Sequence, residues 1–309
     1  MNLALAAISQ IIIMFVLILV GIISYKIKLI DNETNKKLAD IVLLLVNPMV
    51  IIMSYQRKFE ATLLSGLLIS FVLAIATHLI CILLSMILLR KRGADLSIER
   101  FAVIYSNCGF IGIPLVNGIL GGEGVFYLTA YITIFNLVVW THGMVSMSGK
   151  YNKKSIIKAI LSPSVLSIFV GFLLFICHIT LPEIIGKSIS YIGDMNTPLA
   201  MMVAGVTIAQ TNIFKVFVKI RALYISLFKL ILIPIGMLMI FRFFNIPDIV
   251  ILTSILACAC PTAATINLFS IRYDKNYIYA SELFAITTIL SIITIPVVML
   301  LAKLIVSIW

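Results

Sequence analysis

The sequence predicts an all-α integral membrane protein of about ten transmembrane helices, arranged as two inverted five-helix repeats. First, 62% of the 309 residues are hydrophobic and only 11% are charged, which is too little polar surface for a soluble domain. Second, apolar runs of nearly twenty residues, long enough to cross a bilayer, recur along the whole chain. Third, prolines recur at matching places in the two halves of the chain.

Each span is expected to be a helix, because backbone amides in hydrocarbon need partners within their own segment and these runs are too long for barrel strands. The first run lacks the basic region of a cleaved signal, so we expect it to be retained as a span. The predicted spans are roughly Leu3–Tyr25, Lys37–Tyr55, Ala61–Leu89, Phe101–Leu120, Gly124–Met147, Ile156–His178, Ile189–Gln210, Ala222–Phe241, Ile249–Ser270 and Tyr277–Ile308.

The basic residues between the spans predict the orientation of the chain in the cell membrane. Seventeen lysines and arginines fall in alternate loops, beginning with the loop between spans 1 and 2, and five fall on the other side. The positive-inside rule then places both termini outside the cytoplasm. The net charge of +11 is therefore interpreted as an excess of basic loop residues that sets the orientation of the chain in the membrane. Nucleic-acid binding is not expected, since no basic stripe is interleaved with aromatic residues.

The prolines predict an internal repeat. Pro48 and Pro198 are 150 residues apart, and Pro114 and Pro261 are 147 residues apart. Each half contains five spans, an odd number, so the second half must enter the membrane the opposite way up. We expect the first repeat to cover residues 1–150 and the second to cover residues 151–309.

Spans 4 and 9 are predicted to be interrupted near the middle of the membrane. Span 4 reads SNCGFIGIP and span 9 reads ACPTAA, and glycine and proline both disfavour a continuous helix. A half-helix that begins at Pro114 or Pro261 would present free amides there, and each N-terminus carries about half a positive charge. Two such ends would bind an anion without a basic side chain. The alternative is a structural kink that neighbouring side chains satisfy.

Candidate binding residues are the polar and helix-breaking residues of spans 2, 4 and 9, with one residue of span 5. They are Asn47, Pro48, Asn107, Gly109, Gly112, Pro114, Asn136, Pro261, Thr262 and Asn267. No cofactor or metal site is expected, because Cys258 and Cys260 fit the small-residue packing of membrane helices. The same packing explains Gly66, Gly171, Gly205 and Gly236.

Three ionisable residues inside spans are candidates for proton or charge coupling. Lys229 could pair with a substrate carboxylate or with the negative end of a half-helix, or its side chain could extend to the cytoplasmic face. Glu282 could bind a proton, lie solvated at the cytoplasmic mouth or pair with a basic neighbour. His142 could shuttle protons or be packed against a hydrogen-bonding neighbour.

Three stretches of the chain resemble the auxin efflux carrier family of membrane transporters, bacterial type. They are LVNP in span 2, SNCGFIGIPLVNGILGGEG in span 4 and ACPTAATINLFSIRYDKNYIYASELFAITTILSIITIPVVML in spans 9 and 10. The resemblance implies a fold similar to sodium/proton antiporters and bile-acid symporters, with spans 1, 2, 6 and 7 as a scaffold and the others as a moving unit. It also implies a homodimer, and it assigns the crossover residues to Pro114, Pro261 and Asn107.

The sequence therefore predicts a secondary transporter that moves a small organic anion, such as malate, malonate or an auxin-like carboxylate, by alternating access of the elevator type. A sodium-coupled organic-anion symporter is the alternative. An intramembrane enzyme or a channel is more remote, since the sequence has neither the paired aspartates of a membrane protease nor a His-Glu-x-x-His motif.

Overall fold

The computed structural model describes residues 3–89, 95–149, 157, 160–211 and 216–308. It is 83% helix, and the described part of the chain contains no strand. Among these residues six helices are long and apolar enough to cross a membrane, and Pro163–Ile176 and Asp248–Ala259 are shorter apolar helices. The structure is therefore all-helical, as the sequence predicts.

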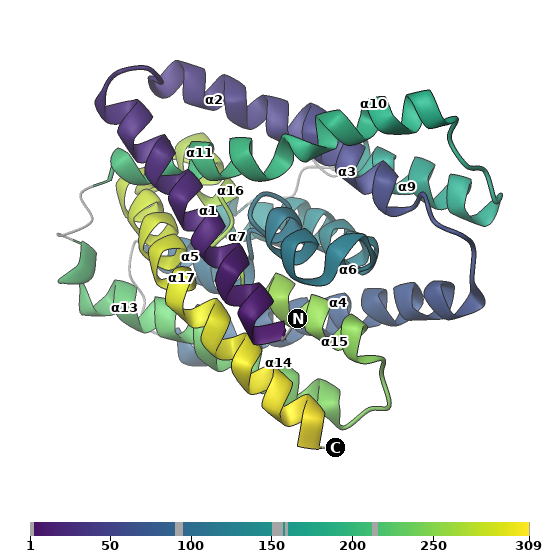
Figure 1. Ribbon diagram of the computed structural model, residues 1–309. Helices are drawn as coiled ribbons and strands as arrows, with labels where there is room; N and C mark the ends of the chain where they lie inside the picture. Colours follow the sequence, from purple (N-terminus) through teal and green to yellow (C-terminus); the bar gives the residue numbers. More distant parts are fainter. Residues whose placement is uncertain (1–2, 90–94, 150–156, 158–159, 212–215, 309) are drawn as a thin grey trace.

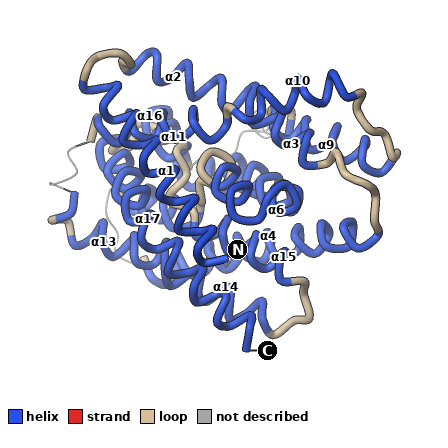
Figure 2. The backbone as a smooth tube through the Cα atoms, viewed as in Figure 1, coloured by secondary structure: helices blue, strands red, loops and turns tan. Residues whose placement is uncertain are grey.

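Figures 1 and 2 show the helices, three of which contain a π-helical segment (η). In chain order they are α1 (Leu3–Lys26), α2 (Asn32–Ile41), η1 (Val42–Val46), α3 (Asn47–Ser54), α4 (Ala61–Leu88), α5 (Leu96–Ile104), α6 (Gly112–Val138), η2 (Val139–Gly143), α7 (Met144–Ser148), α9 (Pro163–Ile176), α10 (Glu183–Asp194), α11 (Asn196–Ala209), α13 (Ile220–Leu227), η3 (Phe228–Leu232), α14 (Ile233–Arg242), α15 (Asp248–Ala259), α16 (Thr265–Arg272) and α17 (Tyr277–Ile308).

Several predicted boundaries shift in the structure. The seventh run begins at Glu183 rather than at Ile189, because the extended Pro182 starts helix α10. Helix α6 loses helical geometry at Gly121, whose φ of 68° suits glycine, and this point separates the predicted spans 4 and 5. The predicted start of span 6 at Ile156 and the repeat boundary at residue 150 lie outside the described residues.

Helix α4 shows the polarity of the molecule, with apolar residues outside and polar residues inside. Its exposed stripe includes Leu68, Val72 and Leu79, which lie at helical spacing. The opposite face buries Thr77 and His78. A soluble helix shows the reverse arrangement, so this surface is suited to a hydrocarbon surrounding.

The helices pack as two groups. Helices α1, α2, α3, α9, α10 and α11 form the first group by their contacts. All but α1 make the upper layer in Figure 1, and α1 runs from this layer down across the second group. Helices α4 to α7 and α13 to α17 form the second group below. Helix α6 contacts α1, α3, α9 and α11, so it is the main bridge between the groups.

Glycines allow the closest helix contacts at three of the four expected positions. A Cβ on Gly205 would lie 2.1 Å from the Ile18 carbonyl oxygen, so α11 and α1 touch backbone to backbone. Added Cβ atoms on Gly66 and Gly171 would meet the tyrosines Tyr127 and Tyr55. The expectation is wrong for Gly236, where a Cβ would meet no atom within 4 Å.

Candidate functional site

Two helices are interrupted, and their linkers meet inside the second group of helices. The first linker joins α5, which ends at Ile104, to α6, which begins at Gly112. The second joins α15, which ends at Ala259, to α16, which begins at Thr265. We call the place where these two linkers meet the crossover.

The linkers are joined by an antiparallel backbone bridge between Ser106 and Thr262. The Asn107 amide donates to the Pro261 carbonyl oxygen at 2.8 Å, and the Ala263 amide donates to the Tyr105 carbonyl oxygen at 2.9 Å. The bridge fixes both interruptions against each other, and it gives buried backbone groups partners that a continuous helix would otherwise supply.

The two prolines act differently from the sequence prediction. Helix α6 begins at Gly112, so Pro114 lies in its first turn, where its missing N–H leaves no bond unmade. Pro261 lies before α16 and holds the preceding Cys260 in an extended conformation, with ψ of 147°. Pro261 therefore ends α15 and does not begin the next half-helix, so Pro114 and Pro261 are not structurally equivalent.

The crossover leaves fewer free amides than expected, because the bridge uses two of them and the Thr262 amide donates to Thr287 Oγ1 at 3.2 Å. Among the described residues, the amides of Phe110, Ala264 and Thr265 donate to no backbone carbonyl outside their own helices. Asn107 is only 5% exposed, and its Nδ2 atom also has no partner in this part of the chain. The buried Asn107 Nδ2 atom needs an acceptor, and together with these amides it is suited to a carboxylate.

One asparagine of the first helix group reaches the crossover, and a second asparagine bonds to it. The Asn47 side chain donates through Nδ2 to the Gly109 carbonyl oxygen at 3.2 Å, and its Oδ1 accepts from Asn196 Nδ2 at 2.6 Å. Pro48 is buried beside Asn47. Sequence reasoning missed Asn196, although it stands 149 residues after Asn47, which nearly matches the offset of the neighbouring prolines.

A second side chain of the first group also contacts the half-helix. Gln10 on α1 donates through Nε2 to the Pro114 carbonyl oxygen at 3.1 Å. A Cβ on Gly118 would lie 2.0 Å from Gln10, so the start of α6 fits closely against α1. The candidate residue Gly112 is buried near Cys260, with Sγ 3.4 Å from the position of an added Cβ. Gln10 carried no signal in the sequence that would mark it.

A polar cavity of about 260 Å³ lies between the two groups of helices. Its lining combines residues of α3, α6, α10 and α11, and Asn196 joins it to the asparagine pair. The polar lining residues are Ser54, Asn117, Ser190, Asp194, Asn196 and Thr197. The cavity is large enough for a small organic molecule, and Asn196 is the lining residue that bonds to Asn47, which contacts the first linker.

Lys229 lies against the crossover from the other side. It is completely buried, and its Nζ donates to Ser106 Oγ at 2.5 Å. Ser106 Oγ in turn donates to the Cys258 carbonyl oxygen at 3.1 Å. The side chain is therefore buried against the first linker, where its partner is the Ser106 hydroxyl.

Three other candidates lie in separate contacts. His142 Nδ1 lies 2.8 Å from the Tyr105 hydroxyl, next to the crossover, as the packed interpretation predicts. Asn136 donates to the Ile132 carbonyl oxygen of its own helix at 2.9 Å. Asn267 Oδ1 accepts from Ser281 Oγ at 3.1 Å. These bonds link His142 to the crossover and leave Asn136 and Asn267 occupied elsewhere.

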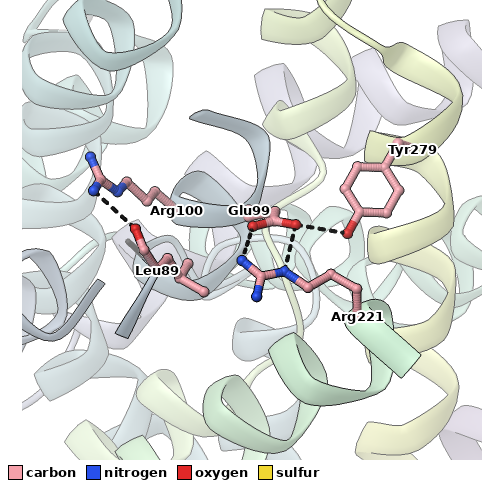
Figure 3. Close-up of polar contacts among 5 residues, drawn as sticks. All are labelled: Leu89, Glu99, Arg100, Arg221 and Tyr279. Carbon is pink, nitrogen blue, oxygen red and sulfur yellow. Dashed lines mark hydrogen bonds and ion pairs between the residues drawn. The ribbon is translucent and has the colours of Figure 1, made fainter. Parts of the chain in front are cut away.

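Glu282 belongs to an ion-pair network at one end of the second group. Glu282 Oε2 lies 2.5 Å from Lys219 Nζ, so pairing with a basic neighbour is the arrangement found. Beside it, Arg221 binds both carboxylate oxygens of Glu99 at 2.6 and 2.9 Å, and the Tyr279 hydroxyl donates to Glu99 at 3.3 Å (Figure 3). The network ties α5 to α13 and α17 around a cavity of about 430 Å³.

Arg100 makes a separate contact in the same region. It donates through Nη2 to the Leu89 carbonyl oxygen at 3.0 Å, which closes the end of α4 (Figure 3). Such a bond satisfies a carbonyl that has no partner in its own helix. Together, the network and this cap hold the N-terminal part of α5 in place, and the first linker follows the C-terminal end of α5.

Comparison with known proteins identifies the family of the chain. The family described as "Membrane transport protein" matches residues 6–299. Uncharacterized transporters of Methanocaldococcus jannaschii and Methanothermobacter thermautotrophicus are 25% and 23% identical to the chain, covering 90% and 91% of it and 93% of each relative. A Rhizobium meliloti protein named "Putative malonate transporter" is 25% identical over 69% of both chains. These names indicate transport across a membrane. The chain is a multi-pass membrane protein that belongs to the auxin efflux carrier family of membrane transport proteins.

Proposed function

We propose that this protein is a secondary carrier that binds a small organic anion at the crossover. The observation that carries the proposal is the buried, unpaired Asn107 Nδ2 atom, beside the amides of Phe110, Ala264 and Thr265, which donate to no backbone carbonyl outside their own helices. The N-terminal ends of α6 and α16 add positive partial charge without an acidic neighbour among their hydrogen-bond partners. Asn47 supplies a polar contact from the opposite helix group.

The fold proposed for this carrier has ten spans in two inverted repeats, residues 1–150 and 151–309. Two features support it: each interrupted helix lies in a different half of the chain, and Asn47 and Asn196 lie at nearly the repeat offset. The two packing groups coincide with the proposed scaffold and moving unit. We propose that the second group slides past the first, carrying the crossover, in an elevator motion.

The substrate class proposed is a short carboxylate, with malonate as the first compound to test, because one relative bears that name. Both termini are proposed to lie outside the cytoplasm, which places the 260 Å³ cavity on the outer side. An anion that leaves a cell negative inside gains about 2.3 kcal/mol per charge per 100 mV, so export would need no coupling ion.

The test is flux into proteoliposomes that contain the purified full-length protein. Radiolabelled malonate should enter faster than into protein-free liposomes, and unlabelled malate should compete for entry. Lactate and indole-acetate define how far the substrate class extends, and a labelled monovalent cation serves as the control substrate. Movement of the cation with no movement of any carboxylate contradicts the proposal.

The sodium-coupled symporter is tested in the same vesicles. A sodium gradient should leave malonate flux unchanged if the proposed carrier is correct, whereas a symporter would accelerate flux with the gradient. A potential imposed with potassium and valinomycin should alter the rate of the proposed carrier, because the charged substrate moves alone, whereas a symporter that moves malonate with two sodium ions carries no net charge.

A further inference from the structure

Lys229 is a buried cation with no anionic side chain beside it. Its side chain is fully buried in the π-helical segment η3, and its ammonium group donates to the neutral Ser106 hydroxyl. In the described part of the chain it forms no ion pair with an Asp or Glu. An ammonium group without compensation is costly in such surroundings, so the structure must supply negative charge in another form.

Helix C-termini supply that charge. Ser106 follows the end of α5 at Ile104, and the Ser106 hydroxyl donates to the carbonyl of Cys258 in the last turn of α15. Each helix C-terminus carries about half a negative charge, so two of them balance about one ammonium group. The Lys229 ammonium group therefore neutralises the negative ends of both first half-helices.

This neutralisation affects the field at the other two helix ends, the N-termini of α6 and α16. Four half-helix ends meet at the crossover, two negative and two positive, and without an added charge their fields would largely cancel. The side chains bonded to the linkers near α6 and α16 are Asn47, Gln10 and Thr287, none of which is charged. With the negative ends compensated by Lys229, the positive ends remain available to an anion.

We propose that Lys229 is a built-in counter-cation, which takes the place that a dissociable coupling cation would otherwise fill at the negative helix ends. The inference rests on the proposed function, anion transport. It extends that proposal by predicting that transport needs no monovalent cation. Lys229 thus does not contact the anion. It favours anion binding indirectly, by offsetting the negative helix ends so that the positive ends can attract the anion.

The experiment measures the apparent KM for malonate in proteoliposomes with sodium chloride, potassium chloride or choline chloride on both sides. Wild-type KM should be the same in all three salts. Lys229→Met keeps the volume and removes the charge, so its KM should rise about tenfold or more in every salt. Lys229→Ala leaves a space beside Ser106 and Cys258, so sodium or ethylammonium should lower its raised KM while choline should not.

Lys37→Met is the matched control, because Lys37 lies exposed in a pair with Glu33, and its KM should equal that of the wild type. Size-exclusion profiles report the folding of each variant, and if Lys229→Ala does not fold, the wild-type salt series and Lys229→Met still decide. A sodium requirement in the wild type, or an unchanged KM in Lys229→Met, overturns the inference while leaving anion transport standing. A wild type that moves no carboxylate overturns both proposals.

Discussion

At the scale of single residues, the crossover is marked by hydrogen-bonding capacity that the protein itself does not use. The backbone amides of Asn107 and Ala263 donate within the bridge, but the side-chain Nδ2 atom of Asn107 is buried without an acceptor. Such a group is costly to keep empty and useful once a ligand accepts from it. By contrast, the side-chain Nδ2 atom of Asn136 donates to the Ile132 carbonyl oxygen of its own helix.

Asn107→Ala is predicted to raise the apparent KM for malonate by about ten- to a hundredfold, because one hydrogen bond to a charged group contributes about 1.5–3 kcal/mol. The measurement is the concentration dependence of flux in proteoliposomes. Asn136→Ala is the matched control and should leave KM unchanged, since its amine bonds to Ile132. Equal effects of the two substitutions would move the binding site away from Asn107.

At the scale of helices, the sequence predicts where the elements lie better than how they end. Proline and glycine placed both interruptions correctly, since their backbone constraints act locally. The sequence did not predict the π-helical segments η1, η2 and η3, which precede Asn47 or contain His142 and Lys229. A single inserted residue leaves no pattern in an apolar run. The partners of Lys229 and Asn196 depend on contacts 123 and 149 residues away in the chain.

Gly205→Ala is predicted to destabilise the pairing of α1 with α11. The added Cβ would lie 2.1 Å from the Ile18 carbonyl oxygen, so the two backbones must separate. Overpacking of this kind costs about 1–3 kcal/mol or more, and here the obstructing atom is backbone that has no rotamer to change. The measurement is the melting temperature in detergent, which should fall by several degrees.

Gly236→Ala is the control for that substitution, because a Cβ there meets nothing within 4 Å. Its melting temperature should stay the same or rise, since alanine favours helix more than glycine does by about 1 kcal/mol. A lower melting temperature for Gly236→Ala than for Gly205→Ala would show that close packing of α1 on α11 does not limit stability.

At the scale of the whole molecule, composition and loop charge predict a membrane protein, and family membership and the apolar exterior agree. The arrangement of helices in two groups could be expected only through the family resemblance. Sequence alone could not give it, because nearly every span is apolar on all sides and hydrophobic periodicity does not say which faces pack together. The contact of Asn47 with Gly109 across the groups is a product of that packing.

The orientation of the chain is testable with its own cysteines. Cys177 at the end of α9 is exposed, whereas Cys81, Cys108, Cys258 and Cys260 are buried. With both termini outside, the end of α9 also lies outside, so a membrane-impermeant maleimide should label Cys177 in intact cells. Cys177→Ser should abolish this labelling, and Arg272→Cys in that background should react only after the membrane is permeabilised, because it lies in a predicted cytoplasmic loop. The opposite pattern would invert the chain and place the 260 Å³ cavity on the cytoplasmic side.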